Sequence, residues 1–300
     1  MTLPDLEELL ALRGAAHDLN LHTSRPVLAR LQGAHRSAQR GRGLEFEEVR
    51  LYTPGDDARN IDWRVTARRG QPHTKLFREE RERPVWLLAD LHSGLYFGSR
   101  YQLKSSLLLR SAALLAWVAS MDGDRLGALI PDNNSDIRIF PPRAREAGVL
   151  PVLEALVEAQ PTKPGAPNAG GLNALLTAIK PLLQPGSLVL VLSDFSGMDE
   201  HTETMLSSMA LRYDCRLLWL TDPLENAGLP NGSFRAGLPG RLWWLDGENS
   251  RNTWHRKWED RERRLNNLTL RLNLPLIRLD TSNPVIEALP PLLREPLWKI

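Results

Sequence analysis

Three separate runs of apolar residues in this chain each end in an aspartate, and this repeat constrains the fold more than any other feature. The runs cover residues 84–89, 187–193 and 215–221, and they lead into Asp90, Asp194 and Asp222. Continuous apolar runs of this length are typical of strands that are buried on both faces of a parallel sheet. Because the carboxyl ends of parallel strands meet at one edge, we expect the three aspartates to lie along the same edge of the sheet.

Segments with helical spacing separate these runs. We expect helices at 100–121, 146–159, 172–183, 199–212, 252–272 and 284–293, and further strands at 124–130, 136–140, 241–245 and 274–279. Strands that alternate with helices favour right-handed crossover connections. The predicted fold class is therefore α/β, with a doubly wound, mostly parallel sheet.

The region ahead of the first apolar run has a different character. Apolar residues at helical spacing predict a helix within 4–21, and Gly41 and Gly43 break regular structure. We therefore divide the chain into two regions. Residues 1–83 hold an N-terminal helical part and a charged extension, and residues 84–300 form the α/β domain.

Residues 45–68, called the hallmark segment below, place aromatic residues among closely spaced opposite charges. The residues that stand out are Phe46, Arg50, Pro54, Gly55, Asp56, Asp57, Arg59, Asp62, Trp63, Arg64 and Arg68. We expect Phe46 and Trp63 to be apolar anchors, because a solvated loop does not need them. The Pro-Gly pair predicts a turn, and the two aspartates after it are suited to cap a short helix. Two compatible interpretations of the charges stay open: a satisfied network that clamps the segment, or a surface that docks a partner.

One motif runs through this segment: Glu45-Phe46, Arg50-x-Tyr52-x-Pro54-Gly55-Asp56-Asp57-x-Arg59-x-Ile61-Asp62-Trp63-Arg64 and Ala67-Arg68. It resembles the hallmark of the family called domain of unknown function 58, and the resemblance extends from about Gly33 to the end of the chain. The resemblance implies a von Willebrand factor A-like domain that works with a MoxR-type AAA+ ATPase. The implied role is a non-catalytic, chaperone-like adaptor in the assembly or remodelling of a client complex.

The same resemblance implies a divalent metal at the carboxyl edge of the sheet. The pattern of the von Willebrand factor A fold is Asp-x-Ser-x-Ser after the first strand, a threonine on a later loop and an aspartate after the fourth strand. This chain keeps Asp90 and Asp194, but it has His92 and Gly94 at the two serine positions and Leu172 at the threonine position. The implied metal site is therefore degenerate.

The candidate metal or docking edge consists of Asp90, His92, Ser93, Asp194 and Ser196. Neighbouring carboxylates repel unless they are protonated, hydrogen-bonded or neutralised by a cation. Three interpretations stay open. The carboxylates accept hydrogen bonds from amides at helix N-termini, they hold Mg²⁺ through oxygen ligands, or His92 favours a transition metal.

No catalytic motif is present in the sequence, which favours a protein that is not an enzyme. No Gly-x-Ser-x-Gly surrounds Ser93, and the chain has neither a P-loop nor a His-Glu-x-x-His motif. Two alternatives stay open: a metal-dependent hydrolase at the Asp90 and Asp194 edge, and a nucleic-acid binder through the basic residues of 36–83. The net charge of +2 gives no overall attraction to nucleic acid, so no nucleic-acid partner is expected.

We expect a cytoplasmic protein that does not span a membrane. The single cysteine, Cys215, fits a reducing compartment. The first eight residues lack the basic and apolar regions of a signal peptide. The most apolar segment, residues 105–121, is shorter than the roughly 20 residues that a spanning helix needs.

The tryptophans are unevenly distributed. Five of the nine lie in the last fifth of the chain, at Trp243, Trp244, Trp254, Trp258 and Trp298. They either fill a core between the sheet and a helix or dock a partner, because aromatic residues are enriched at interfaces.

Overall fold

The computed structural model describes residues 2–17, 19, 21, 44–53, 56, 58–79, 82–132, 136–165, 171–238 and 241–289. The chain forms two compact units, one of Met1–Leu31 with Arg83–Ile300 and one of Gln32–Glu82. The N-terminal helices belong to the larger unit, whereas we expected them in one region with the hallmark segment. The reason is that their apolar side chains join the core of the larger unit.

A six-stranded sheet forms the centre of the larger unit. Its strands lie in the order β10 (Leu276–Asp280), β7 (Asp214–Thr221), β6 (Leu188–Ser193), β3 (Pro84–Ala89), β4 (Arg125–Pro131) and β5 (Ile137–Ala144). Neighbouring strands are parallel except β4 and β5, which are antiparallel. Read from β5 and numbered along the chain, the strands follow the doubly wound order 3-2-1-4-5-6. The prediction of a mostly parallel α/β sheet is confirmed.

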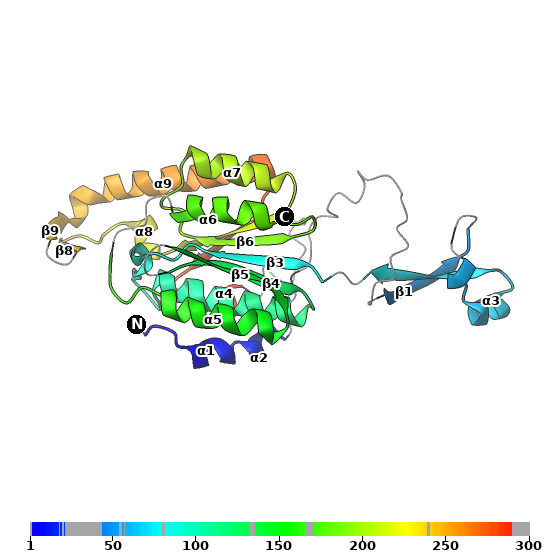
Figure 1. Ribbon diagram of the computed structural model, residues 1–300. Coiled ribbons are helices and arrows are strands. Elements are labelled where there is room, and N and C mark those ends of the chain that lie inside the picture. The colour runs from blue at the N-terminus through cyan, green and yellow to red at the C-terminus, as the bar shows by residue number, and fades with distance from the viewer. Residues whose placement is uncertain are drawn as a thin grey trace. The chain divides into compact units, whose positions relative to one another are not determined.

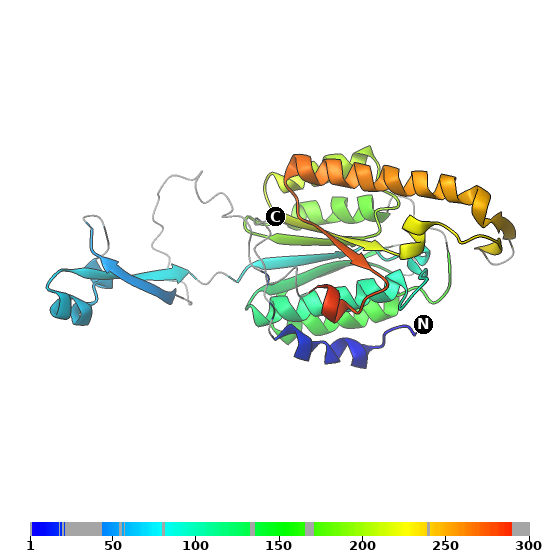
Figure 2. The same cartoon turned by 180° about the vertical axis from the view of Figure 1, so that it is seen from behind.

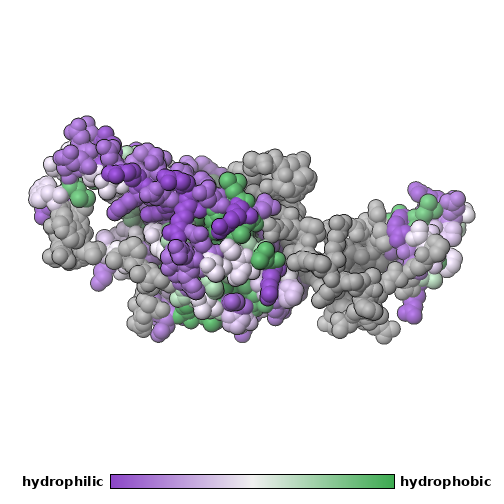
Figure 3. Space-filling view, turned by 90° about the horizontal axis from the view of Figure 1, so that it is seen from above, coloured by the Kyte–Doolittle hydropathy of each residue, from purple (hydrophilic) through white to green (hydrophobic). Residues whose placement is uncertain are grey.

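Helices cover both faces of this sheet (Figures 1 and 2). One face carries α4 (Lys104–Met121) and α5 (Glu146–Ala159), and the other carries α6 (Gly171–Ile179), α7 (Glu200–Ala210) and α9 (Gly247–Leu272). Each face has its own apolar core, because β3 and β6 are buried throughout and send alternate side chains to the two faces. The outer surface of α7 and α9 is mostly hydrophilic (Figure 3).

Helix α4 is enclosed between the sheet and four other helices, which explains why apolar residues occur all round it. Its neighbours include α5 and the N-terminal helices α1 (Leu6–Ala11) and α2 (Arg13–Ala16). The indole N–H of Trp117 donates to the carbonyl of Leu9 at 3.1 Å, and Arg110 pairs with Glu8. A helix that is apolar all round is typically buried. No helix in the described ranges is long and apolar enough to cross a bilayer, which agrees with the prediction for this segment.

The chain reverses its winding direction at β3. From β3 it passes through α4 to β4 on one side, and it later reaches β6 on the other side through α5 and α6. Asp90 and Asp194 directly follow β3 and β6, which are neighbours in the sheet. Both aspartates therefore lie at the topological switch point, where open α/β sheets form ligand crevices.

The C-terminal third differs from the prediction in two places. The strand expected at 241–245 lies outside the main sheet, because β9 (Arg241–Asp246) pairs only with β8 (Ser233–Leu238) among the described strands. Helix α9 begins at Gly247, five residues before the predicted start, because Asp246 accepts from the amide of Glu248 at 2.9 Å and caps the first turn. Shorter helices are η2 (Ser93–Leu95), η3 (Lys180–Leu182), α8 (Pro223–Ala227) and α10 (Val285–Ala288). Residues 290–300 lie outside the described part.

The smaller unit is a hairpin with a short helix. Strand β1 (Leu44–Leu51) pairs antiparallel with β2 (His73–Glu79), and η1 (Ala58–Asn60) and α3 (Trp63–Arg69) lie between them in the sequence. Helix α3 ends at Gly70, whose φ of 72° is in the left-handed region that favours glycine.

Candidate functional site

Asp90 lies at the carboxyl end of β3 and is enclosed by the neighbouring strand. Its Oδ2 accepts a hydrogen bond from Ser193 Oγ at 2.6 Å, and Ser193 Oγ in turn accepts from the amide of Phe195 at 2.9 Å. Burial raises the pKa of Asp90 to about 6, although His92 and the hydrogen bond from Ser193 oppose this rise. The pair ties the ends of β3 and β6 together through one short hydrogen bond.

Asp194, at the end of β6, is neutralised by a side chain from a distant helix. Lys104 Nζ donates to Asp194 Oδ2 at 2.7 Å, and the amide of Ser196 donates to Oδ1 at 2.9 Å. His92 Nε2 lies 3.7 Å from Oδ1. Burial disfavours the ionised carboxylate, but Lys104 and His92 outweigh burial and hold the pKa of Asp194 well below its usual value.

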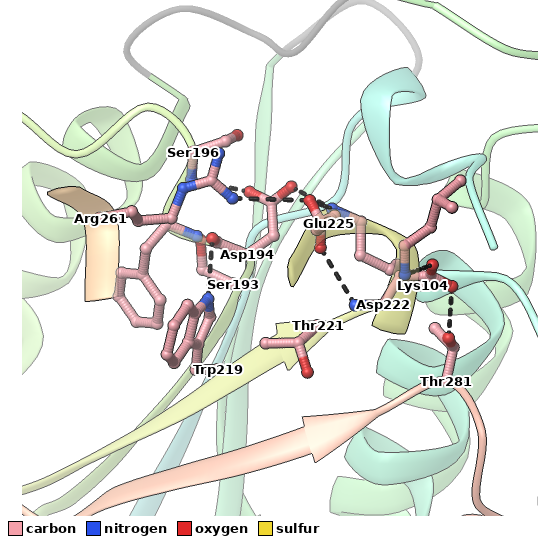
Figure 4. Close-up of polar contacts among 12 residues, drawn as sticks. Lys104, Ser193, Asp194, Ser196, Trp219, Thr221, Asp222, Glu225, Arg261 and Thr281 are labelled. Carbon is pink, nitrogen blue, oxygen red and sulfur yellow. Dashed lines mark hydrogen bonds and ion pairs between the residues drawn. The ribbon is translucent and has the colours of Figure 1, made fainter. Parts of the chain in front are cut away.

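Lys104 is the first residue of α4 and connects two carboxylates (Figure 4). Its ammonium also donates to Glu225 Oε1 at 3.0 Å and lies 5.9 Å from the ring centre of Phe97. The side chain is only 3% exposed. Burial opposes the charged form, but Asp194 and Glu225 outweigh it and raise the pKa of Lys104. Since a cation at a helix N-terminus is disfavoured by the helix dipole, these two carboxylates must hold it there.

Glu225 and Asp222 belong to the capping box of α8. The amide of Asp222 donates to Glu225 Oε2 at 3.1 Å, and Asp222 accepts from the amide of Leu224 at 2.9 Å. Asp222 also accepts from Ser99 Oγ at 2.6 Å and from Thr281 Oγ1 at 2.5 Å. The third strand-end aspartate therefore joins three segments of the fold.

The structure brings most of the predicted edge residues together. Asp90, His92 and Asp194 lie close together, and the amide of Ser196 binds Asp194. The hydroxyl of Ser196 is buried and has no hydrogen-bond partner within the described part of the chain. Ser93 begins η2, and its carbonyl accepts from the amide of Gly165 at 3.1 Å.

Sequence reasoning missed Lys104 and Glu225. The available signal was weak. Within 104–121, Lys104 and Arg110 are the only charged residues, and a charge inside an otherwise apolar helix requires a partner.

These residues do not fit a divalent metal. One oxygen of Asp194 binds an ammonium and the other binds an amide, while Asp90 is bonded to Ser193. Among the residues that the structure describes, no group of three or more His, Cys, Asp or Glu side chains is placed to hold a metal ion. A Mg²⁺ site needs several free oxygen ligands at about 2.1 Å.

A cavity of about 470 Å³, called the edge cavity below, opens at the carboxyl ends of β3 and β4. Its lining consists of Leu91, His92, Ser93, Pro131, Asp132 and residues 158–163. Two atoms of lining residues, His92 Nδ1 and Gln160 Oε1, are buried from solvent and have no hydrogen-bond partner among the residues that the structure describes.

The C-terminal tryptophans divide between a core and a surface. Trp258 is buried and stacks on Trp219, with ring centres 4.9 Å apart. Trp254 lines a second cavity of about 320 Å³ between α8, β9 and α9. Trp244 is 72% exposed, whereas Trp298 and the side chain of Trp243 lie outside the described part.

The hallmark segment contains a local network around two aspartates. Arg50 makes two hydrogen bonds to Asp56, at 2.9 and 2.8 Å, and Tyr52 donates to the carbonyl of Asp56 at 3.2 Å. Asp62 caps α3 by accepting from the amides of Arg64 and Val65. The hydrogen bonds from Arg50 and from Thr53 lower the pKa of Asp56 to about 2.

Several hallmark residues differ from our expectations. Trp63 is 69% exposed and is therefore not an apolar anchor, because it occupies the first position of a solvent-facing helix. The cap of that helix is Asp62, and Asp56 binds Arg50 instead. Arg59, Arg64 and Arg68 are exposed. Pro54, Gly55, Asp57 and the side chain of Phe46 lie outside the described residues.

We expect Asp62→Ala to weaken α3, because the helix loses the side chain that caps its first turn. Amide hydrogen exchange of α3 should quicken roughly fivefold. Asp62→Asn is the matched control, since asparagine caps helices as well as aspartate does. Equal exchange rates in the alanine and asparagine variants would contradict the capping role.

Comparisons with known proteins identify a family and several relatives. The model of the family described as "Protein of unknown function DUF58" matches residues 48–246. Uncharacterized proteins of Mycobacterium tuberculosis and Mycobacterium bovis are 33% identical over 217 residues, which cover 71% of this chain and 66% of each relative. The chain thus matches slightly less than two thirds of the length of these relatives.

Two solved structures are similar at low identity. The conserved hypothetical protein BatB from Bacteroides thetaiotaomicron aligns with a TM-score of 0.41 and 13% identity, over 70% of this chain and 96% of that chain. An aerotolerance-related membrane protein from Bacteroides fragilis aligns with a TM-score of 0.40 and 15% identity, over 69% of this chain and 96% of that chain.

Proposed function

Because the chain belongs to the family of proteins of unknown function called DUF58, we propose that it is a non-catalytic adaptor with a von Willebrand factor A-like domain. Its partners are a MoxR-type AAA+ ATPase and a client protein, and its task is the assembly or remodelling of a client complex in the cytoplasm. The family resemblance of the hallmark segment supports the partner class. The doubly wound strand order supports the domain type.

The edge cavity is the observation that carries this proposal. It opens at the carboxyl ends of β3 and β4, on the edge of the sheet at which open α/β folds bind ligands. Its lining includes polar and charged residues, among them Ser93, Asp132 and Lys163. A concave surface with polar groups among its lining residues suits a partner segment that carries a polar side chain.

The arrangement of charges disfavours catalysis. A general base or nucleophile must reach the substrate within hydrogen-bond distance. Asp194 is bound to Lys104, and Asp90 is bonded to Ser193 and is not among the residues that line the edge cavity. The carboxylates of the edge therefore support structure and docking, and a metal-dependent hydrolase has no specific observation in its favour.

Thr162→Trp is the substitution that tests docking in the edge cavity. Thr162 is exposed and lines the cavity, so an indole at this position fills the space without disturbing the core. We expect recovery of the AAA+ ATPase in a pull-down with ATP and Mg²⁺ to fall at least about tenfold, which corresponds to about 1.4 kcal/mol. The ATPase is identified by mass spectrometry of the recovered proteins.

The matched control is Thr204→Trp, the same change at an exposed position of α7. It should recover as much ATPase as the unchanged chain. Failure of the unchanged chain to recover any AAA+ ATPase would refute the adaptor proposal. Undiminished recovery by Thr162→Trp would move the docking site away from the edge cavity. Metal-dependent hydrolysis that disappears in a folded Asp194→Asn variant would favour the hydrolase instead.

A further inference from the structure

We propose that Lys104 is the built-in cation of the sheet edge, and that its ammonium occupies the position that a divalent metal would otherwise take. This inference goes beyond the adaptor role and does not depend on it, because it concerns only the charge balance of the isolated chain. It also corrects the metal site that the family resemblance implies.

Two carboxylates from distant parts of the chain converge on one point. Asp194 follows β6 and Glu225 lies in α8, yet their oxygens lie 2.7 and 3.0 Å from the same Lys104 Nζ. The two carboxylates therefore present the oxygen-rich pair that a cation site needs (Figure 4). Arg261 adds a second positive group, 3.5 Å from Glu225 Oε1.

The ammonium of Lys104 is almost completely enclosed. The exposed fractions of the side chains of Lys104 and Asp194 are 3% and 4%, and that of Glu225 is 14%. An ammonium buried to this extent cannot also bind a carboxylate of a docking partner. The edge is therefore neutralised from within, and a partner must be recognised through other groups.

The ammonium and a divalent metal ion would compete for the same space. Mg²⁺ lies about 2.1 Å from its oxygen ligands, whereas the ammonium already lies 2.7 Å from Asp194 Oδ2. Two cations cannot share this position. The ring of His92 also lies beside this position, with Nε2 3.7 Å from the other oxygen of Asp194.

Removal of the ammonium should uncover a divalent-ion site. Lys104→Ala leaves the two carboxylates and opens the space between them for an ion with water ligands. Lys104→Met leaves the same carboxylates but fills the space with an uncharged side chain of similar length. Both variants remove the positive charge, but only Lys104→Ala leaves room for an ion between the two carboxylates.

The experiment is a Mn²⁺ titration followed by electron paramagnetic resonance of the free ion, on purified chain with the metal removed beforehand. We expect no saturable binding of Mn²⁺ by the unchanged chain at millimolar ion. Lys104→Ala should bind about one equivalent and show a melting temperature that rises with Mn²⁺ concentration. Lys104→Met should show neither effect, and Lys180→Ala, at an exposed position, should behave like the unchanged chain.

Saturable binding of Mn²⁺ by the unchanged chain that is lost in Asp194→Asn would overturn the proposal. A folded Lys104→Ala variant that gains no Mn²⁺ binding would also overturn it. If Lys104→Ala does not fold, the titration of the unchanged chain still decides the question. The adaptor proposal is tested separately by recovery of the ATPase. That pull-down contains Mg²⁺ for the ATPase, so its result does not report on metal binding by this chain.

Discussion

Lys104→Met should lower the free energy of unfolding by about 3–5 kcal/mol, the cost of leaving a buried charge without its partner. The ammonium of Lys104 lies within hydrogen-bond distance of Asp194 and Glu225. Without it, two carboxylates face each other at the edge of the sheet with no cation between them. Chemical denaturation with urea, followed by far-ultraviolet circular dichroism, measures the loss.

The control for this prediction is Lys180→Met. Lys180 is exposed at the start of η3, and surface substitutions of this kind usually change stability by less than about 0.5 kcal/mol. If Lys104→Met were as stable as this control, the ammonium would not be held between the two carboxylates. The ammonium of Lys104 would then contribute nothing measurable to the stability of the fold.

Asp90→Asn should be more stable than the unchanged chain at neutral pH, and this advantage should shrink at acidic pH. The folded chain raises the pKa of Asp90 from 3.8 to about 6, so the folded state keeps its proton to higher pH than the unfolded state does. The free energy of unfolding of the unchanged chain therefore falls as pH rises between about 4 and 6. The lost stability amounts to about 2–3 kcal/mol above this range.

Asparagine removes this pH dependence and keeps an oxygen that accepts from Ser193. Denaturation of both proteins at pH 4.5 and 7.5 should show a gap in favour of Asp90→Asn that widens toward pH 7.5. Asp136→Asn, at an exposed position, is the control and should show no such widening. A gap that is constant or that narrows would mean that the folded state does not retain the proton of Asp90.

The fold was largely predictable because its strands carry a strong local signal. Buried strands such as β3 and β6 consist almost entirely of apolar residues, and the aspartate after each marks where the strand leaves the core. The parallel sheet and the position of Asp90 and Asp194 at one edge follow from that pattern and from the crossover rule. The alternation of strands and helices along the sequence was enough to predict a doubly wound sheet.

The charge balance of the edge was not predictable in the same way. Lys104 and Asp194 are 90 positions apart in the sequence, and no local pattern links a helix start to a distant strand end. The exposure of Trp63 was missed for a related reason, because its aromatic side chain suggested burial whereas Asp62 places it on the outside of a helix. In both cases the outcome depends on one side-chain contact rather than on a repeating pattern.

A cation that is part of the polypeptide has no dissociation constant. Every copy of the chain carries Lys104 at full occupancy from the moment it folds, so the edge has the same charge in a magnesium-starved cell as in a well-supplied one. The same arrangement also forgoes ion concentration as a means of regulation. Under the adaptor function proposed above, control over docking at this edge would have to come from the partner.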